Sequence, residues 1–174
     1  MKEAWFYEHA FQADRPFTFP SIRTTTWPYV RNLALIKEDF DYSILLKMPY
    51  LKGTIYVLNM PDNSNDLLKL PVEALNTIRR AFAGELGVEY VGPGQVGFYM
   101  FGQKQYVLYN MSNKAASVSL RFTGKLPTDG WNELVHGKSL SVKHDETFTR
   151  FGGPPFTDVS YELKPFEITI VQAP

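Results

Sequence analysis

The sequence lacks three features that point directly to a chemistry or a cellular address. It contains no cysteine, which excludes disulfides, thiolate metal sites and a cysteine nucleophile. Eighteen lysines and arginines balance 18 aspartates and glutamates, so there is no basic field to attract nucleic acid or an anionic membrane. The opening stretch MKEAWFYEHAFQADRP carries charges throughout, so we expect neither a signal peptide nor a membrane span in this chain. These absences leave the compartment unassigned.

Aromatic residues are abundant, with 13 Phe, 10 Tyr and 3 Trp in 174 residues. Such a composition is typical of β-rich structure, and it also suits a surface on which sugar rings stack. The chain is long enough for one domain or for two small ones with a shared core. A net charge of zero provides no electrostatic repulsion between copies of the chain, so a second copy is an expected partner.

The first half of the chain mixes helical and strand patterns. The β-branched stretch at 21–27 predicts an extended segment, and apolar spacing predicts a helix at about 27–38. Residues 40–60 read as two strands around the turn PYLKG, either a hairpin or part of a buried α/β sheet. A second helix is predicted at 71–82, where Pro71 suits the first turn and one stripe is apolar: Val72, Leu75, Ile78 and Phe82.

After Gly87 the pattern changes to short apolar or aromatic runs separated by turn signals such as GPG, SNKA, PTDG and GGPP. Runs such as ASVSLRF and FEITIVQ alternate with period 2, and turns every ~8–12 residues are typical of an antiparallel β-sandwich. We therefore predict an α+β protein, with a small α/β part at 1–86 packed on a β-sandwich at 87–174. No flexible linker separates the two, which predicts rigid packing between them.

The stretch DNSNDLLKLPVE (62–73) resembles a calcium loop in its acid and hydroxyl positions. Asp62, Ser64, Asp66 and Glu73 occupy loop positions 1, 3, 5 and 12. The loop normally bends at a glycine where this chain has Leu67, and the preceding residues predict a strand instead of a helix. The four residues are therefore a weak calcium candidate, and we favour a turn that leads into the helix at 71–82.

No other cluster in the sequence identifies a catalytic site. Glycoside hydrolysis usually takes two carboxylates across a cleft. The acidic residues that cluster in the sequence fall in polar turns, where solvated charges are expected: Glu38, Asp39 and Asp41, and Asp145 and Glu146. The three histidines lack the close spacing of a zinc site: His9, His136 and His144. We assign no catalytic residue and expect no cofactor.

Exposed aromatic rings are the remaining candidates for ligand binding. Trp131 follows a PTDG turn that could expose it at the rim of the sandwich, and Tyr90 and Tyr50 are weaker candidates for carbohydrate stacking. The alternative for Trp131 is packing in the core, which we favour because most large aromatic side chains are substantially buried.

Several stretches carry a family resemblance. GTIYVLNMPDN (53–63) and LLKLPVEALNTIRR (67–80) resemble the C-terminal region of a group of bacterial glycoside-hydrolase-like proteins, and SIRTTTWPYVRNLALIKEDFDYSILLK (21–47) resembles the segment before it. WNELVHGKSL (131–140) and YELKPFEITIVQ (161–172) are similar to the last strands of many glycosidase accessory sandwiches. In that group a glutamine-amidotransferase-like α/β domain gives way to a terminal β-sandwich.

The resemblance implies a carbohydrate-processing context. It transfers no catalytic residue, because an amidotransferase-type domain uses a cysteine nucleophile and this chain has none. We expect a non-catalytic accessory region of a glycoside hydrolase, whose partner is the remainder of that hydrolase or a second copy of the chain. The alternatives are a carbohydrate-binding module that uses exposed aromatics, and a small stand-alone glycosidase.

Overall fold

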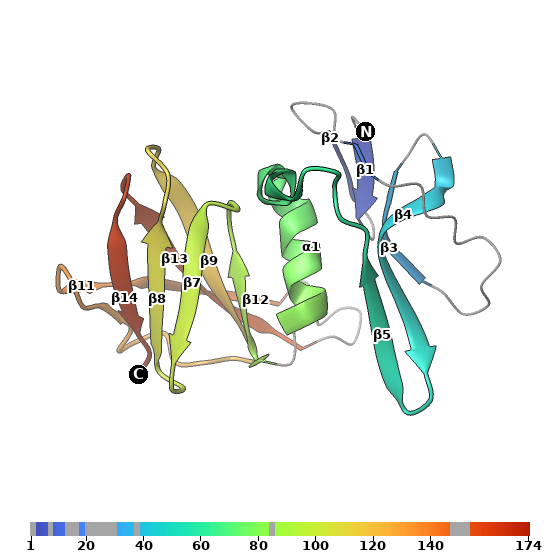
Figure 1. The fold of residues 1–174 in the computed structure, drawn as a ribbon. Coiled ribbons are helices and arrows are strands. Elements are labelled where there is room, and N and C mark those ends of the chain that lie inside the picture. The colour runs from blue at the N-terminus through green and yellow to red at the C-terminus, as the bar shows by residue number, and fades with distance from the viewer. Residues whose placement is uncertain are drawn as a thin grey trace. The chain divides into compact units, whose positions relative to one another are not determined.

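The computed structural model describes residues 3–6, 9–12, 18–19, 31–36, 39–83, 86–146 and 154–174 (Figure 1). The chain divides into two compact units, Met1–Phe82 and Ala83–Pro174, and each is described by itself. Strands make up 48% of the structure, and every pairing between described strands is antiparallel. Among these residues, no helix is long and apolar enough to cross a membrane.

The N-terminal unit contains a five-stranded sheet with the order β2-β1-β3-β4-β5. Its strands are β1 (Glu3–Phe6), β2 (His9–Gln12), β3 (Arg31–Ile36), β4 (Asp39–Tyr50) and β5 (Gly53–Leu58). The hairpin prediction is confirmed, because β4 pairs antiparallel with β5 across Leu51 and Lys52. Parallel strands need long crossover connections, whereas these neighbours are antiparallel. The described strands of this unit therefore form an antiparallel sheet accompanied by one α-helix, whereas the α/β prediction implied parallel strands.

The helix predicted at 27–38 is wrong over Arg31–Ile36, which forms β3. This strand pairs with β1 on one side and with β4 on the other. The run LALI fits helical spacing and a central strand equally well, and pairing with distant segments decides between them. The remainder of that predicted helix, and the extended segment predicted at 21–27, lie outside the described residues.

The helix predicted at 71–82 is confirmed as α1 (Val72–Ala83), which follows the short 3₁₀ helix η1 (Ser64–Lys69). The Leu75 amide donates to the Pro71 carbonyl at 3.1 Å, so Pro71 immediately precedes the first turn. The buried core of this unit joins β4 to the helix: Ile44, Leu45, Leu70, Ala74, Leu75 and Ile78. The apolar stripe is narrower than predicted, because Phe82 is 60% exposed.

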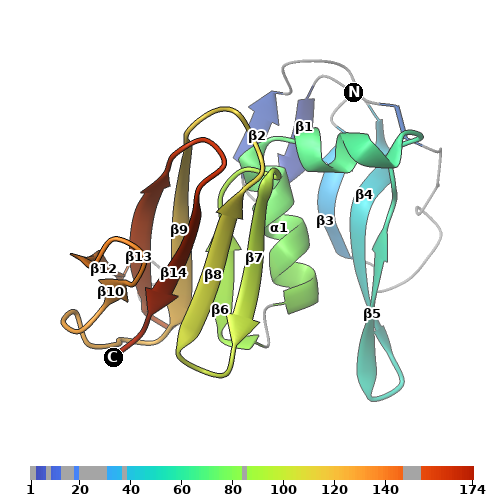
Figure 2. The same cartoon turned by 60° about the vertical axis from the view of Figure 1, so that its left-hand side comes forward.

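The C-terminal unit contains two antiparallel sheets, and Figure 2 shows β9 and β13 running behind β14, β8 and β7. The five-stranded sheet has the order β11-β10-β14-β8-β7: Lys138–Ser139, Asn132–Glu133, Ile168–Gln172, Gln105–Asn110 and Val96–Phe101. The four-stranded sheet has the order β12-β13-β9-β6: Ser141–Asp145, Phe156–Leu163, Ala116–Thr123 and Val88–Val91. The predicted short antiparallel strands after Gly87 are confirmed.

One apolar core is shared by both sheets of this unit. A series of ring contacts runs through it, from Tyr90 on β6 to Phe98 on β7, Tyr106 on β8, Phe122 on β9 and finally Trp131, with centroid separations of 6.0, 6.2, 5.2 and 4.9 Å. Aromatic pairs at such separations add stabilisation beyond the area they bury. The rings therefore link β6 and β9 of one sheet to β7 and β8 of the other.

Candidate functional site

Two of the three predicted sugar-stacking residues lie in the core. Trp131 is 2% exposed and its indole N–H donates to the Pro127 carbonyl at 2.8 Å. Tyr90 is 5% exposed and its hydroxyl donates to the Pro93 carbonyl at 3.0 Å. A sugar stacks on an open ring face, so the assignment of these two rings to carbohydrate is wrong for this conformation, and the packing alternative for Trp131 is confirmed. Tyr50 is 60% exposed and lies at the end of β4 in the N-terminal unit.

The calcium candidate does not assemble. The Asp66 carboxylate accepts from the Lys69 ammonium at 3.1 Å, and the Asn63 side chain caps η1 by accepting from the Asn65 amide. Over the described part of the chain, no three acidic, histidine or cysteine side chains gather as a metal site would require, and this includes the acids Asp62, Asp66 and Glu73. Ser64 begins η1. The loop that would wrap an ion is instead a helical turn, so the interpretation as a lead-in to α1 is confirmed.

The crowded acids are surface charges where the structure describes them. Glu146 contacts Lys125 at 3.3 Å, and both side chains are 61% exposed. Asp145 lies 3.6 Å from Arg121 on the outer face of the four-stranded sheet. Asp39 and Asp41 lie on β4 with side chains outside the description, and Glu38 lies outside it altogether.

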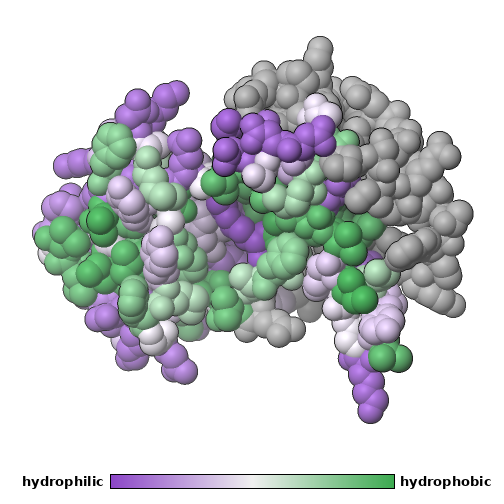
Figure 3. Space-filling model, in the orientation of Figure 1, coloured by the Kyte–Doolittle hydropathy of each residue, from purple (hydrophilic) through white to green (hydrophobic). Residues whose placement is uncertain are grey.

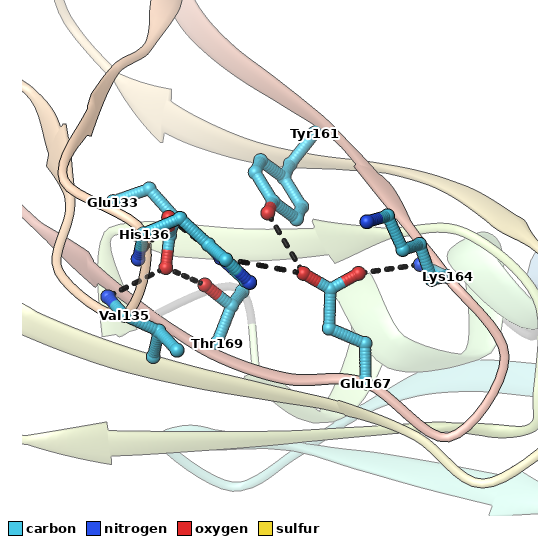
Figure 4. A network of polar contacts seen from close by, with 7 residues as sticks. All are labelled: Glu133, Val135, His136, Tyr161, Lys164, Glu167 and Thr169. Atoms are coloured by element: carbon cyan, nitrogen blue, oxygen red, sulfur yellow. Dashed lines mark hydrogen bonds and ion pairs between the residues drawn. The ribbon is translucent and has the colours of Figure 1, made fainter.

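The tertiary structure assembles a polar cluster that sequence reasoning missed. Glu133 on β10 is 0% exposed, yet both of its carboxylate oxygens are occupied (Figure 4). Oε1 accepts from the Val135 amide at 2.7 Å and from the Thr169 hydroxyl. Oε2 accepts from the His136 amide at 2.8 Å and lies 3.1 Å from His136 Nδ1. One buried carboxylate thereby joins the turn after β10 to strand β14.

A second carboxylate completes the cluster. Figure 4 shows the side chains of His136 and Tyr161 converging on Glu167, whose side chain is 9% exposed. Glu167 Oε1 accepts from the Tyr161 hydroxyl at 2.9 Å and lies 3.7 Å from His136 Nδ1, and Oε2 accepts from the Lys164 amide. The imidazole therefore lies between two carboxylates and is itself 39% exposed.

Hydrogen bonding outweighs burial at Glu133. Removal from water raises the pKa of a carboxyl group, but the donors from Thr169 and from the His136 and Val135 amides stabilise the charged form. The net effect holds the pKa of Glu133 below its ordinary value of 4.5. Glu133 is therefore an anion at neutral pH, and because an anion only accepts, His136 Nδ1 carries the proton in their contact.

The opposite shift occurs at Tyr161. Burial, followed by the hydrogen bond to Glu167 and the charge of that carboxylate, raises the pKa of Tyr161 from 10.0 to about 12. The phenol is thus neutral over the physiological range and donates permanently to Glu167. At neutral pH the cluster therefore contains a charged Glu133 and a neutral Tyr161.

The arrangement is better suited to holding loops than to catalysis. A general acid or base needs a pKa near the working pH and access to a substrate proton, whereas Glu133 is anionic and fully buried. A nucleophile–histidine–acid triad needs a nucleophile on the second ring nitrogen. Across the described residues, the ring of His136 makes its contacts with Glu133 and Glu167.

The cluster had a faint sequence signal. Glu133 is an isolated acid among Trp131, Leu134 and Val135, and His136 follows it at a spacing of three. In the last strand, which begins ITIV, the polar residue Thr169 lies inward and the apolar residue Ile168 is 53% exposed. This is the reverse of the usual apolar-in, polar-out alternation. A polar residue at an inward strand position needs a polar partner. Finding that partner requires the register of β10 on β14, in which Glu133 lies opposite Val171.

Comparison of the chain with protein-family models, with curated proteins and with solved structures gave no match.

Proposed function

We propose that this chain is a non-catalytic accessory region of a glycoside hydrolase, and that its C-terminal unit is a β-sandwich that braces the neighbouring parts of that enzyme. The observation that carries the proposal is the Glu133 cluster. Its acids have the composition of a hydrolytic site, but each carboxylate oxygen is used to hold a turn or a strand end.

The cluster lies within the two stretches that resemble glycosidase accessory sandwiches. WNELVHGKSL supplies Glu133 and His136, and YELKPFEITIVQ supplies Tyr161, Glu167 and Thr169. The stretches that carry the resemblance therefore contain the residues whose side-chain contacts hold the last strands together. An accessory sandwich requires such contacts. This correspondence supports a structural role in a carbohydrate-processing protein.

The same structural use of polar side chains recurs elsewhere in this unit. Asn110 is 0% exposed, donates to the Lys114 and Lys164 carbonyls, and accepts from the Ser112 amide and hydroxyl. Thr157 is also 0% exposed, donates to the Gly124 carbonyl and accepts from the Leu126 amide. Buried polar side chains that hydrogen-bond to turns and strand ends are expected of a domain that braces its neighbours.

The test is hydrolysis by the purified chain. Aryl glycosides of the common hexoses and pentoses are incubated with the wild type and with the Glu133→Gln and Glu167→Gln variants. We expect no turnover above the protein-free blank for any of the three. Turnover by the wild type that disappears in one folded variant would establish the stand-alone glycosidase in place of the accessory role.

Two further measurements separate the remaining alternatives. Sequencing the coding region on either side of these 174 codons is expected to reveal a hydrolase catalytic domain in the same reading frame or an adjacent gene; unrelated genes on both sides would count against the proposal. Affinity electrophoresis in polysaccharide gels, with the wild type beside Tyr50→Ala, tests the carbohydrate-binding module. Retardation that depends on Tyr50 would favour that module.

A further inference from the structure

The two outer faces of the C-terminal unit differ sharply in chemistry. On the four-stranded sheet six outward positions of β9 and β13 are polar: Ser117, Ser119, Arg121, Asp158, Ser160 and Glu162. Outward apolar residues there are Val91 and Phe156, and the Arg121 guanidinium lies over the Phe156 ring. The polar residues bond to one another across the strands, with Ser119 Oγ 2.8 Å from Ser160 Oγ and two Arg121–Asp158 contacts of 2.8 Å. This is the pattern of a sheet face that water solvates.

The outer face of the five-stranded sheet carries no charge on its three longest strands. The register of β7, β8 and β14 places its outward residues in three rows. These rows are Gly97–Tyr109–Ile168, Tyr99–Val107–Ile170 and Phe101–Gln105–Gln172. We call these nine residues, with Leu134 beside Ile170, the apolar face. Leu134 joins it because its amide donates to the Ile170 carbonyl.

This face is too apolar to be an ordinary solvated surface. Charged residues make up 21% of the chain, so nine outward positions would hold about two of them, and here they hold none. Tyr99, Phe101 and Ile168 are 54%, 60% and 53% exposed, and Leu134 is 46% exposed. Figure 3 shows hydrophobic residues gathered over the strands of this sheet. Contiguous apolar surface of this kind marks an interaction site.

At one corner of the apolar face an aromatic ring covers a glycine. A Cβ on Gly97 would lie 3.0 Å from Cε2 of Tyr99 and 3.3 Å from its hydroxyl oxygen, so the Tyr99 ring lies across the glycine. At the other end of the neighbouring strands, Gln105 Nε2 donates to Gln172 Oε1 at 3.0 Å, and Gln172 Nε2 donates to the Ala173 carbonyl at 2.9 Å. An uncharged sheet face suits packing against another sheet face.

We propose that the apolar face is the interface between two copies of this chain related by a two-fold axis. The choice of a second copy rests on charge and area. An uncharged face meets no repulsion from its own copy, and the net charge of zero adds none at long range. A polysaccharide site would need free polar groups beside the rings to bind sugar hydroxyls, whereas the neighbours of Tyr99 in its row are Val107 and Ile170. The glutamine amides beside Phe101 already bond to Gln172 and to the Ala173 carbonyl.

The available area matches a weak dimer. About half of each of two aromatic side chains and of two aliphatic ones is exposed, and three half-buried neighbours extend the surface. This amounts to roughly 400–500 Å² of apolar area on one copy. Two copies would bury roughly 800–1,000 Å², which lies at the lower end of specific interfaces. We therefore expect dissociation constants on the order of 10–100 μM.

The experiment is sedimentation velocity of the whole chain from about 1 to 500 μM, a range that brackets the expected dissociation constant. The wild type is expected to pass from monomer to dimer across this range. Tyr99→Lys and Ile168→Lys are each expected to weaken the dimer about 100-fold, because two like charges would face each other across the axis. Ser117→Lys adds the same charge to the outer face of the other sheet and is expected to leave the dimer unchanged.

The proposal has clear contrary outcomes. A wild type that stays monomeric at every concentration overturns it, as does a dimer that both lysine variants leave intact. Retention of a monomeric wild type on insoluble polysaccharide, abolished by Tyr99→Lys, would assign the apolar face to carbohydrate instead. Circular dichroism of each variant verifies that the fold is retained, and the use of two lysine variants keeps the result decisive if one of them unfolds.

Discussion

Replacing Glu133 with glutamine removes the charge from a fully buried side chain and leaves its size nearly unchanged. Each oxygen of the wild-type carboxylate accepts from two donors. Whichever oxygen becomes the NH₂ group, two donors lose their acceptor and face another donor. Hydrogen bonds to a charged group are worth ~1.5–3 kcal/mol each, and a neutral amide costs less to bury than a carboxylate. We expect Glu133→Gln to lower the free energy of unfolding by about 3 kcal/mol.

The assay is urea denaturation followed by tryptophan fluorescence. The chain has three tryptophans, so Trp5→Phe and Trp27→Phe are introduced in every protein to make Trp131 the reporter of the C-terminal unit. Glu146→Gln is the matched control. Its carboxylate is 61% exposed and pairs with an equally exposed lysine, so the change should stay within about 0.5 kcal/mol.

The pH dependence gives an independent check on the reasoning. The folded-state pKa of Glu133 is lowered, so its ionisation stabilises the protein above the unfolded value of 4.5, and this stabilisation is lost as the pH falls through the folded value. The difference between wild type and Glu133→Gln should therefore be full at neutral pH and shrink as the pH falls below 4.5. A difference under about 1 kcal/mol at neutral pH, or one that does not change with pH, would refute the assignment of Glu133 as a structural anion.

Two further predictions concern the core and the phenol of the cluster. Trp131→Ala should lower the free energy of unfolding by ~3–5 kcal/mol in urea denaturation followed by circular dichroism, since it empties a core position and frees the Pro127 carbonyl; a change under about 1 kcal/mol would contradict the buried placement. Tyr161→Phe should be less stable than wild type at neutral pH, and the gap should narrow as the pH rises from 10 to about 12. Between those pH values the Tyr161 phenol ionises in the unfolded chain while it stays neutral in the folded protein. Unfolding is thereby favoured, and the stabilisation that the neutral phenol provides is lost. Alkaline denaturation measures this, and a gap that widens with pH would reverse the sign and refute it.

Where strong local signals exist, the sequence predicts the elements well. Gly and turn residues separate the strands after Gly87, and Pro71 with the apolar positions Leu75 and Ile78 predicts α1. Turn chemistry and helix initiation depend on residues within a few positions of one another, so they can be read from the chain directly.

Predictions failed where a short apolar run could serve two structures. Residues 31–36 satisfied helical spacing but form β3, because β1 and β4 provide pairing partners that no local pattern reveals. The alternation in ITIVQ correctly indicates a strand but not its orientation. Thr169 lies inside with Glu133, and Ile168 lies outside on the apolar face.

By itself, the sequence determined where several elements begin and end, namely a helix after a proline and short strands between turns. Its composition also excluded thiol chemistry and an excess of charge of either sign. Only the tertiary structure decided which side of each strand is buried, and thus that Trp131 is core, that Glu133 and Thr169 meet, and that an uncharged face is left outside. The reason is that side chains alternate with a period of two, so the inward side is set by pairing with segments tens of residues away. Such partners are recognised by contact in the folded chain, not by proximity in the sequence.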